Sequence, residues 1–263
     1  MQRIVMPLLI LCLLFSCRKK EVSPPDNNDP VNSKLDDYGK AVVAVERAVN
    51  EIDFIGRKIT RNLRGYPNGS SFLDCAEVNT SDVITDDGKK ITLTFNPANR
   101  CSDQNTRQGQ IILFYKEATG ELMIQLNNYR VNGQEVLGNY SFSYTPGDPF
   151  RELVVTNGQL KRDNGDAIRF DAYRSIAWKQ GENTADEQDD IFEIPHCYYH
   201  LFIKNLGLLQ AGLEKPLTIK WSCVDQTRYL PVQGVTLNKT PAGSISYTNY
   251  GNGQCNTYPI SEY

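Results

Sequence analysis

Apolar residues recur every three or four positions in the segment that starts near residue 33. The repeating residues are Leu35, Tyr38, Val42, Val45, Val49, Ile52, Ile59 and Leu63, with Gly56 as the one break. This spacing places them on one face of an α-helix. Ser33 followed by Asp36 resembles a capping box, and Gly65-Tyr66-Pro67 supplies a stop signal. We therefore predict an amphipathic helix over residues 33–65.

The apolar face of this helix is wider than a strict coiled-coil seam. It is widened by Ala41, Ala44, Ala48 and Ile55. A broad face favours a single helix laid on a sheet over a helical oligomer, although the pattern leaves the oligomeric state open.

From Cys75 onward the apolar period changes to two, which is typical of strands with one buried face. The clearest stretches are residues 91–95, 122–126, 140–144, 168–178, 197–203 and 217–223, and Arg174 is the exception in its stretch. Pairs that favour tight hairpin turns lie at Asp87-Gly88, Asn132-Gly133, Asn157-Gly158 and Asn164-Gly165. The fold class is mainly β: an antiparallel meander of about ten strands, forming a sandwich, a curved sheet or a barrel-like closure.

The first residues have the pattern of a secretory signal. A basic start is followed by an apolar run over residues 4–15, which is shorter than the about 20 residues that span a bilayer. The ending Leu14-Phe15-Ser16-Cys17 resembles the lipobox of bacterial lipoproteins, in which the cysteine is released at its amino end and acylated. We predict a signal peptide over residues 1–16 and a lipid anchor on Cys17; the alternative is an ordinary signal cut elsewhere. The Pro- and Asn-rich residues 17–32 are expected to be a disordered tether.

Composition excludes some partners. The chain has 28 basic and 31 acidic residues, a net charge of −3, so no basic surplus points to nucleic acid. The basic run Arg18-Lys19-Lys20 is smaller than the clusters of 4–8 that recognise lipid headgroups, and we interpret it as a solvated start. We predict that the protein contacts the membrane through an acylated Cys17.

Five cysteines follow Cys17, and an exported protein can use them in disulfides. Spacing alone does not choose among their pairings. Two stretches, however, have the same order: Cys75, strand residues and Cys101, then Cys223, strand residues and Cys255. This similarity suggests an internal duplication within a β domain over residues 66–263, with halves near 75–160 and 161–263. The suggested bridges are Cys75–Cys101 and Cys223–Cys255.

A wider resemblance covers the chain from about Cys75 to its end. The motifs are Cys75-Ala-Glu-Val, Ile91-Thr-Leu-Thr-Phe, Cys101-Ser-Asp, Arg107-Gln-Gly-Gln-Ile-Ile, Asn128-Tyr-Arg-Val-Asn-Gly, Val136-Leu-Gly, Leu217-Thr-Ile-Lys-Trp-Ser-Cys, Pro231-Val-Gln-Gly and Tyr250-Gly-Asn-Gly-Gln-Cys. As a set they resemble a group of Bacteroidota envelope lipoproteins with a lipobox, a spacer and a cysteine-punctuated β repeat. The resemblance implies architecture and an outer-membrane location, but no particular activity. Cys197 has no place in that pattern, so we expect it to be a free, buried thiol.

Few residues suggest catalysis or metal binding. His196 and His200 are four apart, and in a strand that separation is about 13 Å, too far for one metal ion. The acidic run over residues 186–193 matches no EF-hand, and we interpret it as a solvated loop. We therefore predict no metal, no cofactor and no catalytic residues.

Tyrosines are abundant, and five lie late in the chain: Tyr198, Tyr199, Tyr247, Tyr250 and Tyr258. They suit a sheet surface, and exposed ones can stack on sugars. Two function hypotheses lead: a non-catalytic lipoprotein that binds a glycan or protein or has a structural role, and a hydrolase of glycan or envelope material. A third is a periplasmic carrier of apolar molecules. The periplasmic or cell-surface face is left open.

Overall fold

The structure, a computed structural model, describes residues 34–63, 74–83, 88–103, 105–144, 150–161, 165–182, 184, 186–224 and 229–263. The predicted signal peptide, Cys17, the tether and Ser33 lie outside these ranges.

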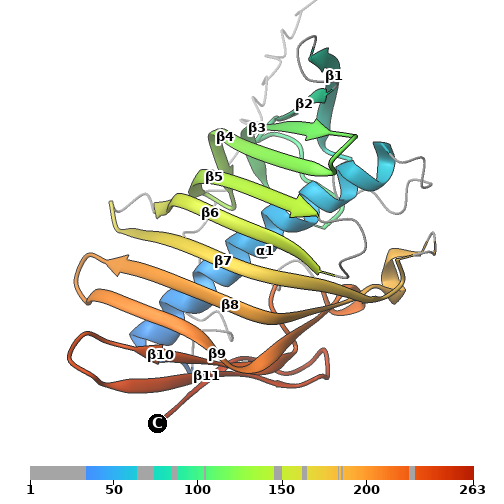
Figure 1. The fold of residues 1–263 in the computed structure, drawn as a ribbon. Helices are drawn as coiled ribbons and strands as arrows, with labels where there is room; N and C mark the ends of the chain where they lie inside the picture. Colours follow the sequence, from blue (N-terminus) through green and yellow to red (C-terminus); the bar gives the residue numbers. More distant parts are fainter. Residues whose placement is uncertain are drawn as a thin grey trace, which may run out of the picture.

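One antiparallel sheet contains twelve strands in chain order, with β1 and β12 as its edges (Figure 1). The strands are β1 (Ala76–Val83), β2 (Gly88–Phe95), β3 (Arg107–Lys116), β4 (Glu121–Val131), β5 (Gln134–Tyr144), β6 (Phe150–Lys161), β7 (Ala167–Gln180), β8 (Ile191–Ile203), β9 (Gly207–Lys220), β10 (Gln233–Lys239), β11 (Ile245–Asn252) and β12 (Ile260–Glu262). Two 3-10 turns, η1 (Glu187–Asp189) and η2 (Trp221–Cys223), flank the β8–β9 pair. The predicted meander is confirmed, as an open sheet with slightly more strands than expected.

Helix α1 (Asp37–Leu63) runs diagonally across one face of the sheet, behind the strands in Figure 1. The Asp36 Oδ1 atom accepts from the Gly39 N–H group at 2.5 Å, so Asp36 itself is the N-terminal cap. The predicted capping box is therefore replaced by a simpler cap one residue before the helix. The Asp36 N–H group donates to Ser261 Oγ at 2.9 Å, which fixes the start of the helix beside β12.

The helix is enclosed to a degree that its sequence pattern does not predict. Of the residues from Ala41 to Thr60, only Ala44 and Arg47 are more than marginally accessible. The Asn50 side chain donates to the carbonyl oxygen of Tyr229 at 2.7 Å, from a segment that follows η2. The prediction of a helix laid on a sheet is confirmed, but the polar side of the helix is buried as well.

Gly56, the break in the apolar stripe, marks a close approach between the helix and β4. A Cβ atom there would lie 3.0 Å from Leu122 Cδ2 and 3.2 Å from Ile124 Cδ1. These distances are shorter than ordinary van der Waals contact, so glycine lets the helix pack closely on the sheet.

One predicted turn is wrong. Asn132 and Gly133, with φ of 49° and 82°, do form the β4–β5 turn. Asn157 and Gly158 instead lie inside β6, where the register against β7 shifts. Asn157 has a φ of 55°, and a Cβ on Gly158 would lie 2.6 Å from the Phe170 ring. The pair forms a β-bulge. Asn and Gly favour the left-handed backbone that both tight turns and bulges use, so the residue types alone did not distinguish the two.

Both suggested disulfides are present: Cys75–Cys101 and Cys223–Cys255. Each closes a loop that contains one hairpin, β1–β2 or β10–β11, at opposite ends of the sheet. Cys197 is free and buried, facing the helix side of β8. The disulfides indicate an oxidising, exported environment. Among the described residues, no helix is long and apolar enough to cross a membrane. The duplication itself stays a prediction.

Candidate functional site

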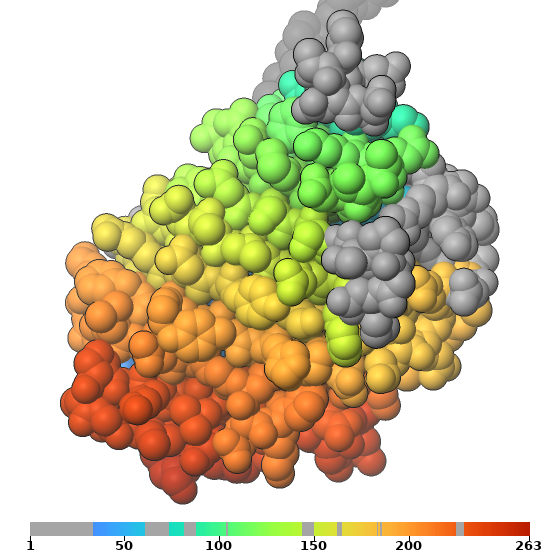
Figure 2. Space-filling view, viewed as in Figure 1, coloured from blue at the N-terminus to red at the C-terminus, as the bar shows by residue number. Residues whose placement is uncertain are grey.

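The sheet face opposite α1 carries a row of mostly apolar side chains, and Figure 2 shows the molecule from this side. Cross-strand partners join one residue from each of seven strands: Phe114, Met123, Ser141, Val154, Tyr173, Tyr198 and Gly212. We call this set the aromatic row. Met123 is 51% exposed and Tyr198 42% exposed. At about 4.8 Å between strands, the row is about 29 Å long.

Neighbouring polar groups hold the two tyrosines of the row. The Tyr173 hydroxyl donates to Glu152 Oε1 at 2.9 Å, and this hydrogen bond raises the pKa of Tyr173. The Tyr198 hydroxyl contacts His200 Nε2, and the two rings meet edge-on with centroids 4.5 Å apart. Rings held in place lose little conformational entropy when a ligand stacks on them.

A groove of about 480 Å³ lies beside the row, at the ends of β4 to β8. It is lined by Arg130, Glu135, Gln159, Lys161, Gly165, Ala167, Arg169, Phe202 and Lys204. We call it the basic groove, since four of these side chains are cations and one is a carboxylate.

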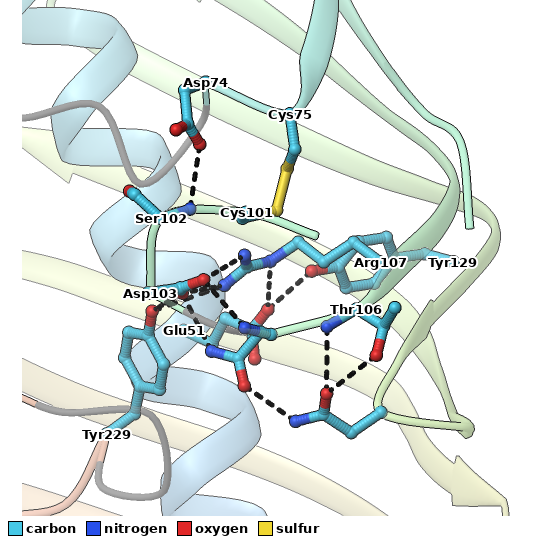
Figure 3. Close-up of a disulfide and its surroundings, with 12 residues drawn as sticks. Glu51, Asp74, Cys75, Cys101, Ser102, Asp103, Thr106, Arg107, Tyr129 and Tyr229 are labelled. Atoms are coloured by element: carbon cyan, nitrogen blue, oxygen red, sulfur yellow. Dashed lines mark hydrogen bonds and ion pairs between the residues drawn. A yellow bond between two sulfur atoms is a disulfide. The ribbon is translucent and has the colours of Figure 1, made fainter. Parts of the chain in front are cut away.

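Beneath the sheet, helix carboxylates meet two buried arginines. The Arg107 cluster contains Glu51, Asp103, Arg107, Tyr129 and Tyr229 (Figure 3). Arg107 Nε donates to Glu51 Oε1 at 3.0 Å, and its two terminal nitrogens donate to Asp103 at 3.0 and 2.6 Å. The Tyr129 hydroxyl donates to Glu51 at 2.6 Å, and the Tyr229 hydroxyl donates to Asp103.

These contacts set the charge states in the Arg107 cluster. Burial alone raises the pKa of the Asp103 carboxyl, but the hydrogen bonds and charge of Arg107 outweigh burial and lower it. Burial and the Glu51 charge raise the pKa of Tyr129 well above its ordinary value. Asp103 is therefore held as the charged partner of Arg107, and the Tyr129 phenol keeps its proton.

The Arg174 cluster contains Glu46, Asn50, Arg174 and Tyr199. Arg174 donates to Glu46 Oε2 at 3.0 Å, to Asn50 Oδ1 at 2.5 Å and to the Tyr199 hydroxyl at 2.6 Å. The Tyr199 hydroxyl donates to Glu46. The side chains of Arg174 and Glu46 are both 0% exposed. The glutamates of both clusters are buried against their arginines, so both clusters hold the helix against the sheet.

Sequence reasoning missed these clusters. One signal was present, because Arg174 breaks the apolar alternation of its strand at a position that faces the core. Glu46 and Glu51 gave no signal, since charged residues between apolar helix positions are normally solvated.

The predicted chemistry-bearing residues are dispersed. His196 and His200 lie on the exposed face of β8, as the strand pattern predicts. The interpretation of residues 186–193 as a solvated loop is partly wrong: Glu187 is buried and pairs with Lys58, and Asp190 accepts from Trp178 Nε1 at 3.2 Å. Within the described ranges, no group of three or more His, Cys, Asp or Glu side chains is placed to hold a metal ion.

Adjacent tyrosines have different positions and roles. Tyr198 is exposed in the aromatic row, whereas Tyr199 and Tyr250 are buried. Cys197 lies beside the Arg174 cluster, where burial raises the pKa of its thiol. A thiol with a raised pKa is a poor nucleophile, which fits a packing role.

Comparison of the chain with protein-family models, curated proteins and solved structures finds no match in any of the three.

Proposed function

We propose that this protein is a non-catalytic, glycan-binding lipoprotein of the bacterial outer membrane, held there by an acylated Cys17. The aromatic row carries the proposal: five neighbouring strands of the seven place the exposed side chains of Met123, Val154, Tyr173 and Tyr198 in cross-strand register, with Ser141 between Met123 and Val154. Sugars present apolar C–H faces, and exposed aromatic rings stack on such faces. An extended row suits a polymer rather than a small, enclosed ligand.

The hydrolase alternative receives less support. Glycoside cleavage needs two carboxyl groups about 5–9 Å apart around an accessible bond. The helix carboxylates Glu46 and Glu51 are buried and each is bonded to an arginine. The row itself contributes no carboxylate.

The carrier alternative needs an apolar cavity inside the curved sheet. α1 occupies that side, with Val49, Ile52 and Ile55 at no more than 1% exposure. A cavity between the helix and the β8–β9 region, lined in part by Phe54 and Trp221, holds only about 20 Å³. That is room for about one water molecule.

Affinity electrophoresis in gels that contain a panel of neutral and acidic polysaccharides tests binding. We expect the protein to be retarded by at least one polymer, and the Tyr173→Ala/Tyr198→Ala variant to lose at least about tenfold in affinity, because stacking contributes several kcal/mol over two rings. Tyr258→Ala, an exposed tyrosine outside the row, is the matched control. Unchanged retardation of the row variant would reject the proposal.

The anchor is tested separately. Labelling cells with a radioactive fatty acid should mark the wild-type chain and leave Cys17→Ala unlabelled and released from the membrane fraction. Equal labelling of both would exclude Cys17 as the acylated residue.

A further inference from the structure

The basic groove adds a charge preference to the proposed glycan site. Its cations come from three different strand ends: Arg130 from β4, Lys161 from β6 and Arg169 from β7, with Lys204 just after β8. Among the described residues of the lining, Glu135 is the one carboxylate, and its Oε2 atom lies 3.6 Å from a terminal nitrogen of Arg130. The whole chain is net negative, so this local excess of positive charge runs against its overall charge.

Three of the four cations are available to a ligand. Among the described residues, the side-chain ammonium groups of Lys161 and Lys204 have no hydrogen-bond or ion-pair partner, and Arg169 has its guanidinium carbon 5.8 Å from the centroid of the Phe202 ring. Like charges gathered around one concavity repel one another, and an anion in the groove relieves that repulsion.

The groove continues the aromatic row along β8. Tyr198, His200 and Phe202 alternate on the same exposed face, so Phe202 lies about 13 Å from Tyr198 along the strand. Asp171 lies opposite His200 on β7, between row and groove, and its Oδ1 atom accepts from the Asn157 N–H group at 2.9 Å. Phe202 is 43% exposed and lines the groove, so it offers a second stacking surface beside the cations.

We propose that the basic groove binds the carboxylate groups of an acidic polysaccharide whose chain also lies on the aromatic row. This inference rests on the proposed function and names its substrate class: a polymer of sugar acids. Because the groove lies about 13 Å from the row along β8, a polymer that lies on the row enters the groove by turning along β8 past His200 to Phe202. The cations lie around a concavity, which fits a polymer segment entering it better than a flat bilayer surface.

The test uses two forms of one polymer. Polygalacturonate carries a carboxylate on each sugar, and its methyl ester has the same backbone without the charge. We expect the full-length protein to bind polygalacturonate at least about tenfold more tightly than the ester, because hydrogen bonds to charged groups are the stronger ones. Added salt should reduce this difference, since the groove is exposed to solvent.

The variant Lys161→Gln/Arg169→Gln/Lys204→Gln should bind polygalacturonate no better than the ester. A control with the same change in net charge, Lys40→Gln/Lys215→Gln/Lys239→Gln, should keep the preference, because those exposed lysines lie outside the groove. Circular dichroism and the melting temperature check that both variants are folded.

The outcomes separate the two proposals. If the protein binds both polymers equally and the Tyr173→Ala/Tyr198→Ala variant binds neither, the charge preference is overturned and glycan binding is kept. If the protein binds phosphatidylglycerol vesicles and not polygalacturonate, and Lys161→Gln/Arg169→Gln/Lys204→Gln loses vesicle binding, the groove is assigned to a membrane surface and the inference is overturned. Failure to retain polygalacturonate at low salt would also overturn it.

Discussion

The two buried arginine clusters have the same core and different surroundings. In each, an arginine on one strand and a tyrosine on the next strand both donate to a glutamate of α1. The Arg174 cluster adds Asn50, whose side chain donates to the carbonyl oxygen of Tyr229 at 2.7 Å, and its Arg174 Nε atom has no hydrogen-bond partner among the described residues. The Arg107 cluster continues to Asp103 and Tyr229, which belong to loops near the two disulfides.

The difference shows two uses of one arrangement. The Arg174 cluster joins helix to sheet in a dry environment, whereas the Arg107 cluster also joins two loops from opposite ends of the sheet across the helix. Asp103, whose side chain is 12% exposed, brings the Arg107 cluster near water. A buried ion pair gives little net stability, but removing one partner leaves an uncompensated charge.

The largest expected effect is the loss of unfolding free energy when the arginine of each cluster is substituted, and its size should differ between the two clusters. Arg174→Met should cost about 3–5 kcal/mol of unfolding free energy, because Glu46 is left charged in a dry site. Arg107→Met should cost less, since the Glu51 and Asp103 side chains that lose their cation are 4% and 12% exposed, against 0% for Glu46, and can be partly hydrated. Urea titration measures both values.

The double variant Glu46→Met/Arg174→Met is the control for this prediction. It removes both charges and should recover most of the loss. If Arg107→Met were the more damaging single change, the loops rather than the dry helix–sheet contact would dominate stability.

Disulfide removal sharpens the comparison. Cys75→Ser/Cys101→Ser should cost about 3–4 kcal/mol through the freed loop, and Cys223→Ser/Cys255→Ser a similar amount. In a double-mutant cycle, loss of Cys75–Cys101 should couple to Arg107→Met by about 0.5–3 kcal/mol, because Asp103 follows Cys101 by two residues. The same loss should be additive with Arg174→Met to within about 0.5 kcal/mol. Equal coupling to both arginines would contradict separate roles.

The smallest expected effect is on how stability depends on pH in acid. The folded state lowers the pKa of Asp103 below the ordinary value of about 3.9. Its contribution to stability is therefore present above that ordinary value and is lost as pH falls through the lowered pKa. Asp103→Asn and Arg107→Met should flatten the dependence of the urea midpoint on pH in this range, and Arg174→Met should retain it. An unchanged slope in Asp103→Asn would assign the acid sensitivity to other carboxylates.

Local patterns in the sequence predicted the elements of this fold. The three- and four-residue spacing from Leu35 gave α1, the alternation near Ile91 and Tyr140 gave strands, and the repeated cysteine order gave both disulfides. The two periodic patterns are short and depend on which side of one element faces apolar surroundings. The Asn157-Gly158 bulge was mistaken for a turn because both structures use the same left-handed backbone.

The candidate site could not be predicted in this way. The aromatic row depends on the registers of seven strands, and bulges such as the one in β6 shift those registers. Likewise, Arg107 and Arg174 meet helix carboxylates 56 and 128 residues away. The sequence by itself determined which residues form helix, strand and disulfide, since those follow from local period and spacing. Only the tertiary structure decided which strand positions stand opposite one another and which charges are buried together, because both depend on register and on the helix path across the sheet.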